Sequence, residues 1–526
     1  METNSFVSYV HHITKRLLNT TPGTISFQEW FDHNRQGEER NKSFTDTLRF
    51  LESIDPRISE TESFIKDEFY ADPKNPRLIN AYNDECKAML GAIQRYVDLR
   101  LYDITLSGAS GDRCVFPKHF DVSTRASLLE QHLSHHPVVG TDFTSMEKHH
   151  RGIRARLGFF WISHVLRPLG LPSDVLDLVY SQICTTNQSR LGNFRLSIDQ
   201  TLMSGAVWTS SLNGFLNFSL ISYCYLRSRY PQLRARALSR HVDDFVGFVE
   251  GDDGIFVCSQ ELDLRVVNNL GLDLKFDYFK DYTRASFCGI VKPDHDSNDL
   301  ITDPKKILNT FFFSKCRDVN STTKKINGLQ RAKALSLYFM YRNCPIVSVL
   351  CKNVLKLTRS YNVDLNAHGW WEKGVLKLAL DEMKSTKFHI NHVPQCSPQS
   401  RLCVEELFGI EVSLQIQIEE QLDLWGNGLP HKIPYVPCME KNYIHGAKYL
   451  FETKTNFSPP PTVNNNFTSL NIFRGANQGI QISTLRPKSL SPLIFRASPY
   501  SRAPYTTRKS IIPFHFDFDF YFNSKN

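Results

Sequence analysis

Two short β-rich segments separated by Gly-Asp-Asp constrain the fold of this chain more than any other feature. Residues 245–250 and 254–258 are rich in Phe, Val and Ile, and Gly251, Asp252 and Asp253 stand between them. Strand-forming residues on both sides of a short turn that contains Gly and Asp predict a β-hairpin. Taken alone, a hairpin with an acidic turn is a common structural element and carries no function.

The residues before this hairpin have an equally regular pattern. The apolar residues that precede Asp142 predict a short strand that ends in that acid. Apolar positions from Ile153 to Val165 recur at helical spacing, and a second helix is predicted to open near Ser210 and run to Tyr223. Strand, helix, helix and hairpin in this order predict an α+β fold with the helices packed on one face of the sheet.

Composition narrows the class of protein. Hydrophobic residues make up 41% of the chain, which excludes a chain that is disordered throughout. The length of 526 residues is enough for several lobes. The 12 cysteines form no Cys-x-x-Cys pair, so a zinc site of the usual spacing is not expected. No run of 18 apolar residues and no cleavable leader is visible, so we expect a soluble cytosolic chain with free thiols.

Acidic side chains recur at three places that must be explained together. Asp142 is followed five residues later by Glu147, and Asp252, with Asp253 next to it, lies 110 residues beyond Asp142. Carboxylates at the tips of adjacent strands repel one another unless a cation lies between them, and hard oxygen ligands favour Mg²⁺ or Mn²⁺. Two such ions can activate a 3′-hydroxyl and stabilise a pyrophosphate leaving group. This spacing therefore favours nucleotidyl transfer.

Five ordered segments make the chain resemble a known family. TDFTSMEKH (141–149), SGAVWTSSLNG (204–214) and VEGDDGIF (249–256) resemble the three central palm motifs of positive-strand RNA virus RNA-dependent RNA polymerases. Residues 64–68 and 74–79 are similar to the basic finger motif of the tombusvirus- and nodavirus-like group, and residues 285–289 to the hairpin beneath the primer end. The resemblance covers roughly residues 60–300.

The resemblance implies a right-hand polymerase fold of fingers, a palm with an antiparallel sheet, and a thumb. The expected segments are an N-terminal extension or fingers region (1–60), fingers with the basic motif (61–137, basic and turn-rich), palm with an inserted fingers segment (138–300), a mostly helical thumb (301–450) and a disordered, low-complexity basic tail (451–526). Helices are expected within the thumb at 324–357 and 374–383. The tail carries nine Lys and Arg against three Asp and Glu, and so holds most of the net charge of +8.

The same resemblance implies template-directed RNA synthesis from ribonucleoside triphosphates with two Mg²⁺ (or Mn²⁺) ions. Asp142 and Asp252 would hold the metals, with Asp253 assisting at the same turn. The triphosphate would be bound by four residues of the basic motif, namely Lys66 and Arg77 as direct partners, Glu68 orienting them and Lys74 adding to the field.

Two further groups of residues follow from the resemblance. Asn213, with Glu147 and Thr209, would test the ribose 2′-hydroxyl, and the Ser204-Gly205 loop would flex as the template advances. Lys275 would protonate the pyrophosphate, with Lys280 as the rival. The sequence departs from many relatives in two ways: Glu147 replaces Asp, and Asn80-Ala-Tyr-Asn stands where another basic residue is common.

Other interpretations remain open at this point. A reverse transcriptase shares the palm carboxylates but would usually carry a bulky aromatic where the sugar is checked. A catalytically inactive RNA-binding replication scaffold would not need the three aspartates. Asp243-Asp244 is expected to lie at the start of a hairpin strand, and the histidines at 132, 135, 136, 149 and 150 are expected to have packing or surface roles.

The expected partners are those of an RNA replication enzyme. They are the RNA template, the nascent strand, nucleoside triphosphates, and other viral or host replication factors. The expected place is the host cell cytoplasm, at membrane-associated replication sites, with attachment through partners or through the basic tail.

Overall fold

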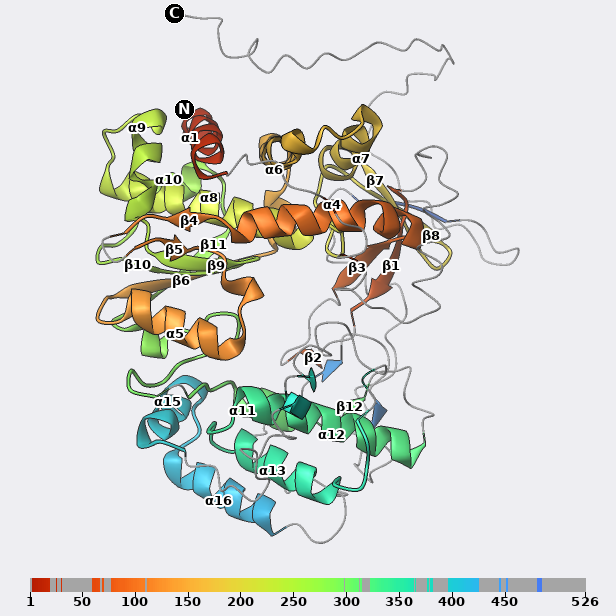
Figure 1. Cartoon of the computed structure of the whole chain (residues 1–526), viewed down its shortest axis with the longest axis vertical. Coiled ribbons are helices and arrows are strands. Elements are labelled where there is room, and N and C mark those ends of the chain that lie inside the picture. Colours follow the sequence, from red (N-terminus) through yellow and green to blue (C-terminus); the bar gives the residue numbers. More distant parts are fainter. Residues whose placement is uncertain are drawn as a thin grey trace, which may run out of the picture. The chain divides into compact units, whose positions relative to one another are not determined.

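The Gly-Asp-Asp hairpin forms one side of a four-stranded antiparallel sheet in the computed structural model of the chain (Figure 1). The hairpin strands are β9 (Gly247–Glu250) and β10 (Asp253–Val257). Strand β6 (Val138–Phe143) pairs with β10, and β11 (Leu274–Phe279) pairs with β6, which gives the order β11-β6-β10-β9. Both the predicted strand before Asp142 and the predicted hairpin are confirmed.

The structure describes the following parts of the chain: residues 2–18, 25, 30, 59–66, 69–70, 77–108, 111–297, 299–311, 313–314, 322–363, 365, 376–377, 379–381, 396–424, 444–445, 451–452 and 480–484.

The two faces of the four-stranded sheet contact different helices. Phe143 and Phe256 join a large core that includes α8 (Thr209–Arg229), whereas Phe248 and Ile255 pack with Leu129 of α5 (Val122–Leu133). Successive residues of a strand point to opposite faces. Asp142 precedes Phe143, and Asp253 lies two residues before Ile255, so both acids belong to the face that α5 covers.

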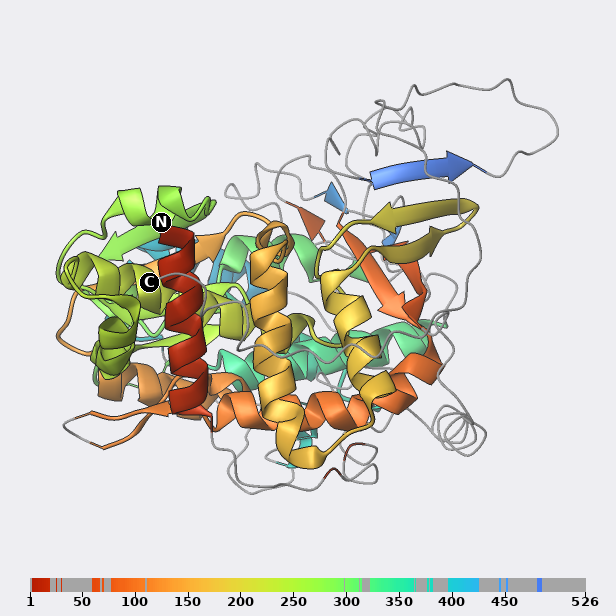
Figure 2. The same cartoon turned by 90° about the horizontal axis from the view of Figure 1, so that it is seen from above.

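The large core is built mainly from helices. Figure 2 shows α1 (Glu2–Leu17), α6 (Ile153–Leu166) and α7 (Ser173–Cys184) side by side, and α1 and α7 each contact α6. The two helices predicted between Asp142 and the hairpin are confirmed as α6 and α8. α8 is buried along most of its length, which explains why its sequence is apolar on nearly all sides.

A second sheet is assembled from distant parts of the chain. Its five strands, in the order β15-β8-β7-β1-β3, are β15 (Ile480–Thr484), β8 (Phe194–Ile198), β7 (Asn187–Leu191), β1 (Thr61–Ile65) and β3 (Leu78–Tyr82). Strand β1 is parallel to β7 and antiparallel to β3, so the region before the first acidic strand and the region between α7 and α8 share one sheet. The β7–β8 hairpin was not predicted from the sequence.

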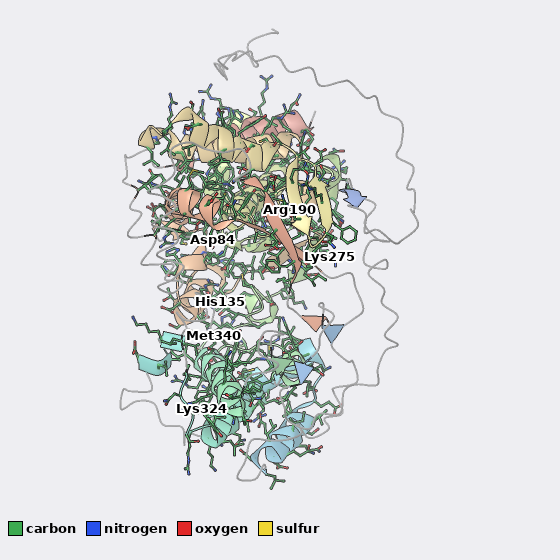
Figure 3. The ribbon with its side chains drawn as sticks, turned by 90° about the vertical axis from the view of Figure 1, so that its right-hand side faces the viewer. Asp84, His135, Arg190, Lys275, Lys324 and Met340 are labelled. Carbon is green, nitrogen blue, oxygen red and sulfur yellow. The ribbon has the colours of Figure 1, made fainter. Side chains whose placement is uncertain are left out.

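Helices beyond residue 300 form most of a second hydrophobic core, which also includes Ala126 of α5. Its helices are α11 (Pro304–Thr310), α12 (Thr323–Met340), α13 (Val347–Leu357), α15 (Pro398–Phe408) and α16 (Val412–Asp423), with Lys324 and Met340 marking the ends of α12 in Figure 3. The helix predicted over 324–357 is two helices, because Pro345 cannot continue a helix. Of 374–383, residues 376–377 and 379–381 are described, and they are helical.

Three small sheets complete the described structure. The pairs are β4 (Thr105–Leu106) with β5 (Arg113–Cys114), β2 (Phe69–Tyr70) with β13 (Ile444–His445), and β12 (Phe313–Ser314) with β14 (Phe451–Glu452). The remaining short helices include α9 (Ala235–Leu238) and α10 (Leu264–Asn269). The fold is therefore mixed α+β, as predicted.

Two local expectations were wrong. The segment 61–137 was expected to be turn-rich, but its described part contains α4 (Asp84–Tyr102) and α5, whose first turns are capped by Asn83 and Asp121 side chains that accept backbone N–H groups. The Asp243-Asp244 pair lies in the 3₁₀ helix Ser239–Asp244, before β9 begins, rather than at the start of a strand.

Among the described residues, no helix is both long and apolar enough to cross a membrane. The ten cysteines in the described part of the chain are free thiols, as expected.

Candidate active site

Strand register brings two predicted catalytic acids together with a lysine. Lys275 on β11 is the direct cross-strand partner of Asp142 on β6. On the other side of β6, Gly254 pairs with Thr141, and continuing that antiparallel register places Asp253 beside Asp142. Lys275, labelled in Figure 3, is exposed, as is Asp142. The sheet therefore presents a basic and two acidic side chains in one cross-strand row.

The turn that carries Asp252 contains only two residues. Glu250 pairs with Asp253, so Gly251 and Asp252 alone connect the strands. Gly251 has a φ of +61°, a value that glycine adopts readily and other residues rarely adopt. Asp252 is exposed at the tip.

The carboxylates of this site affect one another. Burial and the charge of Asp252 raise the pKa of Asp253 to about 6, with smaller contributions from Asp142 and Glu250, while contact with Cys288 acts in the opposite direction. Burial and the charge of Asp252 also raise the pKa of Asp142, and Lys275 opposes this shift. Like charges this close favour the protonated forms unless a cation relieves the repulsion.

The donor set suits a hard divalent cation in its chemistry. Asp142, Asp252 and Asp253 offer only carboxylate oxygens, the ligands that Mg²⁺ and Mn²⁺ prefer. The mutual repulsion of these acids is the interaction that such a cation would relieve. Within the described ranges, no group of three or more His, Cys, Asp or Glu side chains is already arranged to hold a metal ion.

An ion pair that the sequence did not predict lies beside the turn. Arg125 of α5 contacts Glu250 with an N···O distance of 2.8 Å, and both side chains are largely buried. Arg125 also donates to the backbone carbonyls of Phe120 and Lys118. The pair connects the hairpin to α5, and no motif in the sequence indicates it because the partners are 125 residues apart.

Lys66 and Arg77 meet at one end of the second sheet. The last pair between β1 and β3 joins Ile65 to Leu78, and the Lys66 backbone N–H then donates to the Arg77 carbonyl at 2.8 Å. Two residues of the basic motif are thus adjacent, although 11 positions separate them. Glu68 and Lys74 lie outside the described residues.

The Ser204-Gly205 loop lies directly against this basic segment. The Asn80 backbone N–H donates to the Ser204 carbonyl at 2.8 Å. Gly205 has a φ of +98°, and a Cβ there would lie 2.7 Å from Ile79 Cγ2 and 2.9 Å from the Asn80 carbonyl oxygen. Only glycine fits this approach, so the loop and β3 are closely packed.

The three residues expected to read the ribose are not joined to one another. The Thr209 hydroxyl donates to the carbonyls of Met203 and Ala206, both at 2.9 Å, so it fastens the loop before α8. Glu147 is exposed on a 3₁₀ helix (Met146–His149), whereas the Asn213 side chain contacts the buried His150 ring. In the described part of the chain no hydrogen bond links these three side chains.

The imidazole ring of His150 contacts the Asn213 side chain. The ring is completely buried, and burial lowers its pKa to about 3, with the Asn213 side chain opposing the shift. His149 next to it is also buried, and its pKa falls to about 4 for the same main reason. Both rings are therefore neutral packing groups at neutral pH, in line with the expected packing role.

The segment expected beneath the primer end is a tight hairpin. Phe287 and Ile290 exchange backbone hydrogen bonds of 2.9 and 3.1 Å, and Cys288 and Gly289 between them have φ values of +54° and +75°. The Cys288 side chain reaches Asp253, as its influence on that pKa indicates. The hairpin therefore lies at the same site as the acidic turn.

The second acidic pair and the rival lysine lie outside the cross-strand row. Asp243 pairs with Arg16 of α1 and accepts the Ser107 N–H, and Asp244 accepts the Tyr230 hydroxyl at 2.6 Å. Lys280 follows the end of β11, so it is not in the cross-strand row that contains Lys275.

No protein-family model matches the chain, and no curated protein sequence matches it.

Proposed function

We propose that the chain is an RNA-dependent RNA polymerase of the positive-strand RNA virus type, with a right-hand fold. One observation carries the proposal: strand register places Asp142, Asp253 and Lys275 in one row, with Asp252 at the adjoining turn. In this assignment the four-stranded sheet with α6 and α8 is the palm, the five-stranded sheet belongs to the fingers, and the helices beyond 300 form the thumb.

Asp142 and Asp252 would hold two Mg²⁺ or Mn²⁺ ions, with Asp253 assisting. When bound, such ions supply activation of a 3′-hydroxyl and charge stabilisation on the leaving pyrophosphate. The short turn and the strand register bring these three residues to neighbouring positions of the sheet. Their mutual repulsion, which contributes to the raised pKa of Asp253, favours cation binding.

Lys66 and Arg77 would bind the triphosphate of the incoming nucleotide. Their backbones are hydrogen-bonded to each other at the end of the second sheet, and two cations bound to the triphosphate would offset the charge that grows on phosphoryl oxygens during transfer. The contact of the Ser204-Gly205 loop with β3 couples this basic segment to the start of α8. Glu68 and Lys74 belong to the same proposed group through the sequence motif alone.

Lys275 is the proposed general acid for pyrophosphate, and Lys280 is its rival. The pairing of Lys275 with Asp142 supports the first choice, because it puts an ammonium group at the acidic site. Asn213 and Glu147 remain the proposed readers of the 2′-hydroxyl. For Thr209 the structure supports a different contribution, which is to hold the loop through its two hydrogen bonds.

The decisive experiment is template-dependent nucleotide incorporation with Mg²⁺ and with Mn²⁺. We expect Asp252→Asn to lower incorporation by about 100-fold or more, because a metal-binding charge is lost while the exposed turn keeps its shape. RNA affinity should change little. Asp263→Asn is the matched control, since Asp263 caps α10 and Asn caps a helix equally well. Full synthesis by Asp252→Asn would show that the metal assignment is wrong.

Two other functions are separated by the same assay. A reverse transcriptase would prefer deoxyribonucleotides, whereas the proposed polymerase would prefer ribonucleotides, with Asn213 near the start of α8 as the proposed reader of the ribose hydroxyl. A non-catalytic RNA-binding scaffold would bind RNA without any incorporation by the unaltered chain.

The proposed setting is the host cytoplasm, at membrane-associated replication sites, with other viral or host factors as partners. The basic segment 451–526 is the proposed tether to RNA or to an anionic membrane surface. Flotation with anionic liposomes, with and without these residues, tests the membrane role, and equal binding would remove it.

A further inference from the structure

Asn217 contacts the acidic turn from the helix that lies behind it. This residue of α8 is completely buried, and its Nδ2 donates to the carbonyls of Gly251 and Asp253, each at 3.1 Å. The two acceptors lie on either side of Asp252. A side-chain amide has two N–H donors in one plane, so a single Asn can hold both peptide groups at once.

Helix α8 lies so close to the hairpin that the side chain at position 217 has little room to move. A Cβ on Gly254 would lie 2.5 Å from Thr141 Oγ1 and 3.1 Å from Ile221 Cδ1 of α8. The helix therefore packs against the hairpin backbone itself. A side chain at position 217 meets the turn directly, and its chemistry determines how the turn is held.

The side-chain oxygen of Asn217 indicates why the residue at this position is Asn. Its Oδ1 is buried and has no hydrogen-bond partner. Burying an unpaired acceptor is unfavourable, and an apolar side chain of similar size would avoid that cost. The presence of Asn is thus explained by the two bonds that it donates to the turn, and not by packing alone.

We propose that Asn217 is a positioning residue that fixes the direction of the Asp252 and Asp253 carboxylates relative to Asp142, and thereby sets the affinity of the site for divalent cations. The catalytic consequence rests on the proposed polymerase function, whereas the effect on cation binding does not. Asn217 lies outside the five segments that carry the resemblance, three residues beyond the segment that ends at Gly214.

The test compares two buried asparagines in the full chain. Asn353 of α13 also donates through Nδ2 to two acceptors, the Leu422 carbonyl at 3.1 Å and Asp423 Oδ1 at 2.9 Å, but it lies among the helices of the second hydrophobic core. Asn217→Ala and Asn353→Ala both remove two hydrogen bonds, so both should lower the melting temperature. Only the first should affect the cation site.

Cation binding is read directly from the electron paramagnetic resonance signal of free Mn²⁺ during titration. We expect Asn217→Ala to weaken Mn²⁺ binding by about tenfold to 100-fold, the range for residues that orient metal ligands, and Asn353→Ala to leave it unchanged. In incorporation assays the Mg²⁺ requirement should rise for Asn217→Ala, while the KM for nucleotide at saturating Mg²⁺ stays close to that of the unaltered chain.

The outcomes separate this inference from the proposed function. Equal Mn²⁺ affinity in the unaltered chain and in Asn217→Ala overturns the inference, whether or not the chain makes RNA. Weaker Mn²⁺ binding by Asn217→Ala in a chain that makes no RNA supports the inference and counts against the polymerase. If Asn217→Ala does not fold, Asn217→Ser, which keeps one donor, takes its place with the same expected direction.

Discussion

Two adjacent histidines, His149 and His150, follow the first acidic strand, and both are buried. Each has a pKa well below the usual value for histidine, mainly because of burial, and the charge of Arg154 acts in the same direction on each. Since protonated forms are disfavoured in the folded state, the folded protein binds fewer protons than the unfolded chain between about pH 3 and pH 6.5.

Acid should therefore destabilise the protein through His150. The stabilisation from its lowered pKa is complete above about pH 6.5 and is lost progressively as the pH falls toward 3, at up to about 1.4 kcal/mol per pH unit. Between pH 7 and pH 5 the unaltered chain should lose about 2 kcal/mol more free energy of unfolding than His150→Gln, which cannot titrate. Urea unfolding at the two pH values measures this, and identical pH dependence of both proteins would contradict it.

At the scale of the elements, the contact between the Ser204-Gly205 loop and strand β3 has a strict steric requirement. Gly205→Ala combines a positive φ with contacts of less than 3 Å to Ile79 and Asn80. Gly111→Ala is a matched control, since Gly111 has a φ of +107° but nothing within 4 Å of an added Cβ.

We expect Gly111→Ala to cost about 1–2 kcal/mol, because only backbone strain is introduced. Gly205→Ala should cost about 1–3 kcal/mol more, because the loop must also move away from β3. It should in addition raise the KM for nucleotide, which Gly111→Ala should not do. Thermal unfolding and steady-state incorporation check the pair. Similar values for both variants would mean that the loop is not held against β3.

The elements that the sequence could predict are those whose signal is local. Apolar residues before Asp142 and on both sides of Gly251 indicate β6, β9 and β10, and helical spacing indicates α6 and α8. The pairing of β11 with β6 could not be predicted, because Lys275 and Asp142 are 133 residues apart and only the folded sheet makes them neighbours.

The residues of the candidate site also divide into those that a local sequence pattern indicates and those that only the fold reveals. Motif spacing is sufficient to propose Asp142, Asp252 and Asp253, since each belongs to a short segment with its own pattern. Arg125 and Asn217 were missed, because their partners are distant in sequence and no periodicity marks them. Contacts between elements depend on packing, which a local pattern does not encode.

At the scale of the whole molecule, the second hydrophobic core and the core under the four-stranded sheet meet at α5, where a buried lysine is paired. Lys292 is only 1% exposed, and its Nζ pairs with Glu130 Oε2 of α5 at 2.9 Å. The carbonyls of Asp294 and His295 also accept from it. Lys292 follows Val291 of the second core, and α5 contributes Ala126 to that core and Leu129 to the core under the sheet, so this ion pair lies at the junction.

Removing one partner of this pair should destabilise the protein strongly. Glu130→Gln keeps the shape but leaves the buried Lys292 ammonium with only the Asp294 and His295 carbonyls as acceptors, which should cost about 2 kcal/mol. Glu60→Gln is the matched control, because the Glu60–Arg190 pair is exposed and worth less than about 1 kcal/mol. Thermal and urea unfolding measure both. Equal losses in the two variants would show that the junction does not depend on the buried pair.

Strand register also limits how the length of this sequence can vary during evolution. One residue inserted between Val138 and Asp142 would turn Asp142 toward α8, because every side chain after the insertion changes face. Residues can be inserted at surface turns of the long connection from Asp142 to Asp252 without turning Asp142 to the other face. The turns at Gly170 and Gly192 are examples. Relatives of this chain should therefore differ in length around those turns, and should align without gaps across β6 and the β9–β10 hairpin.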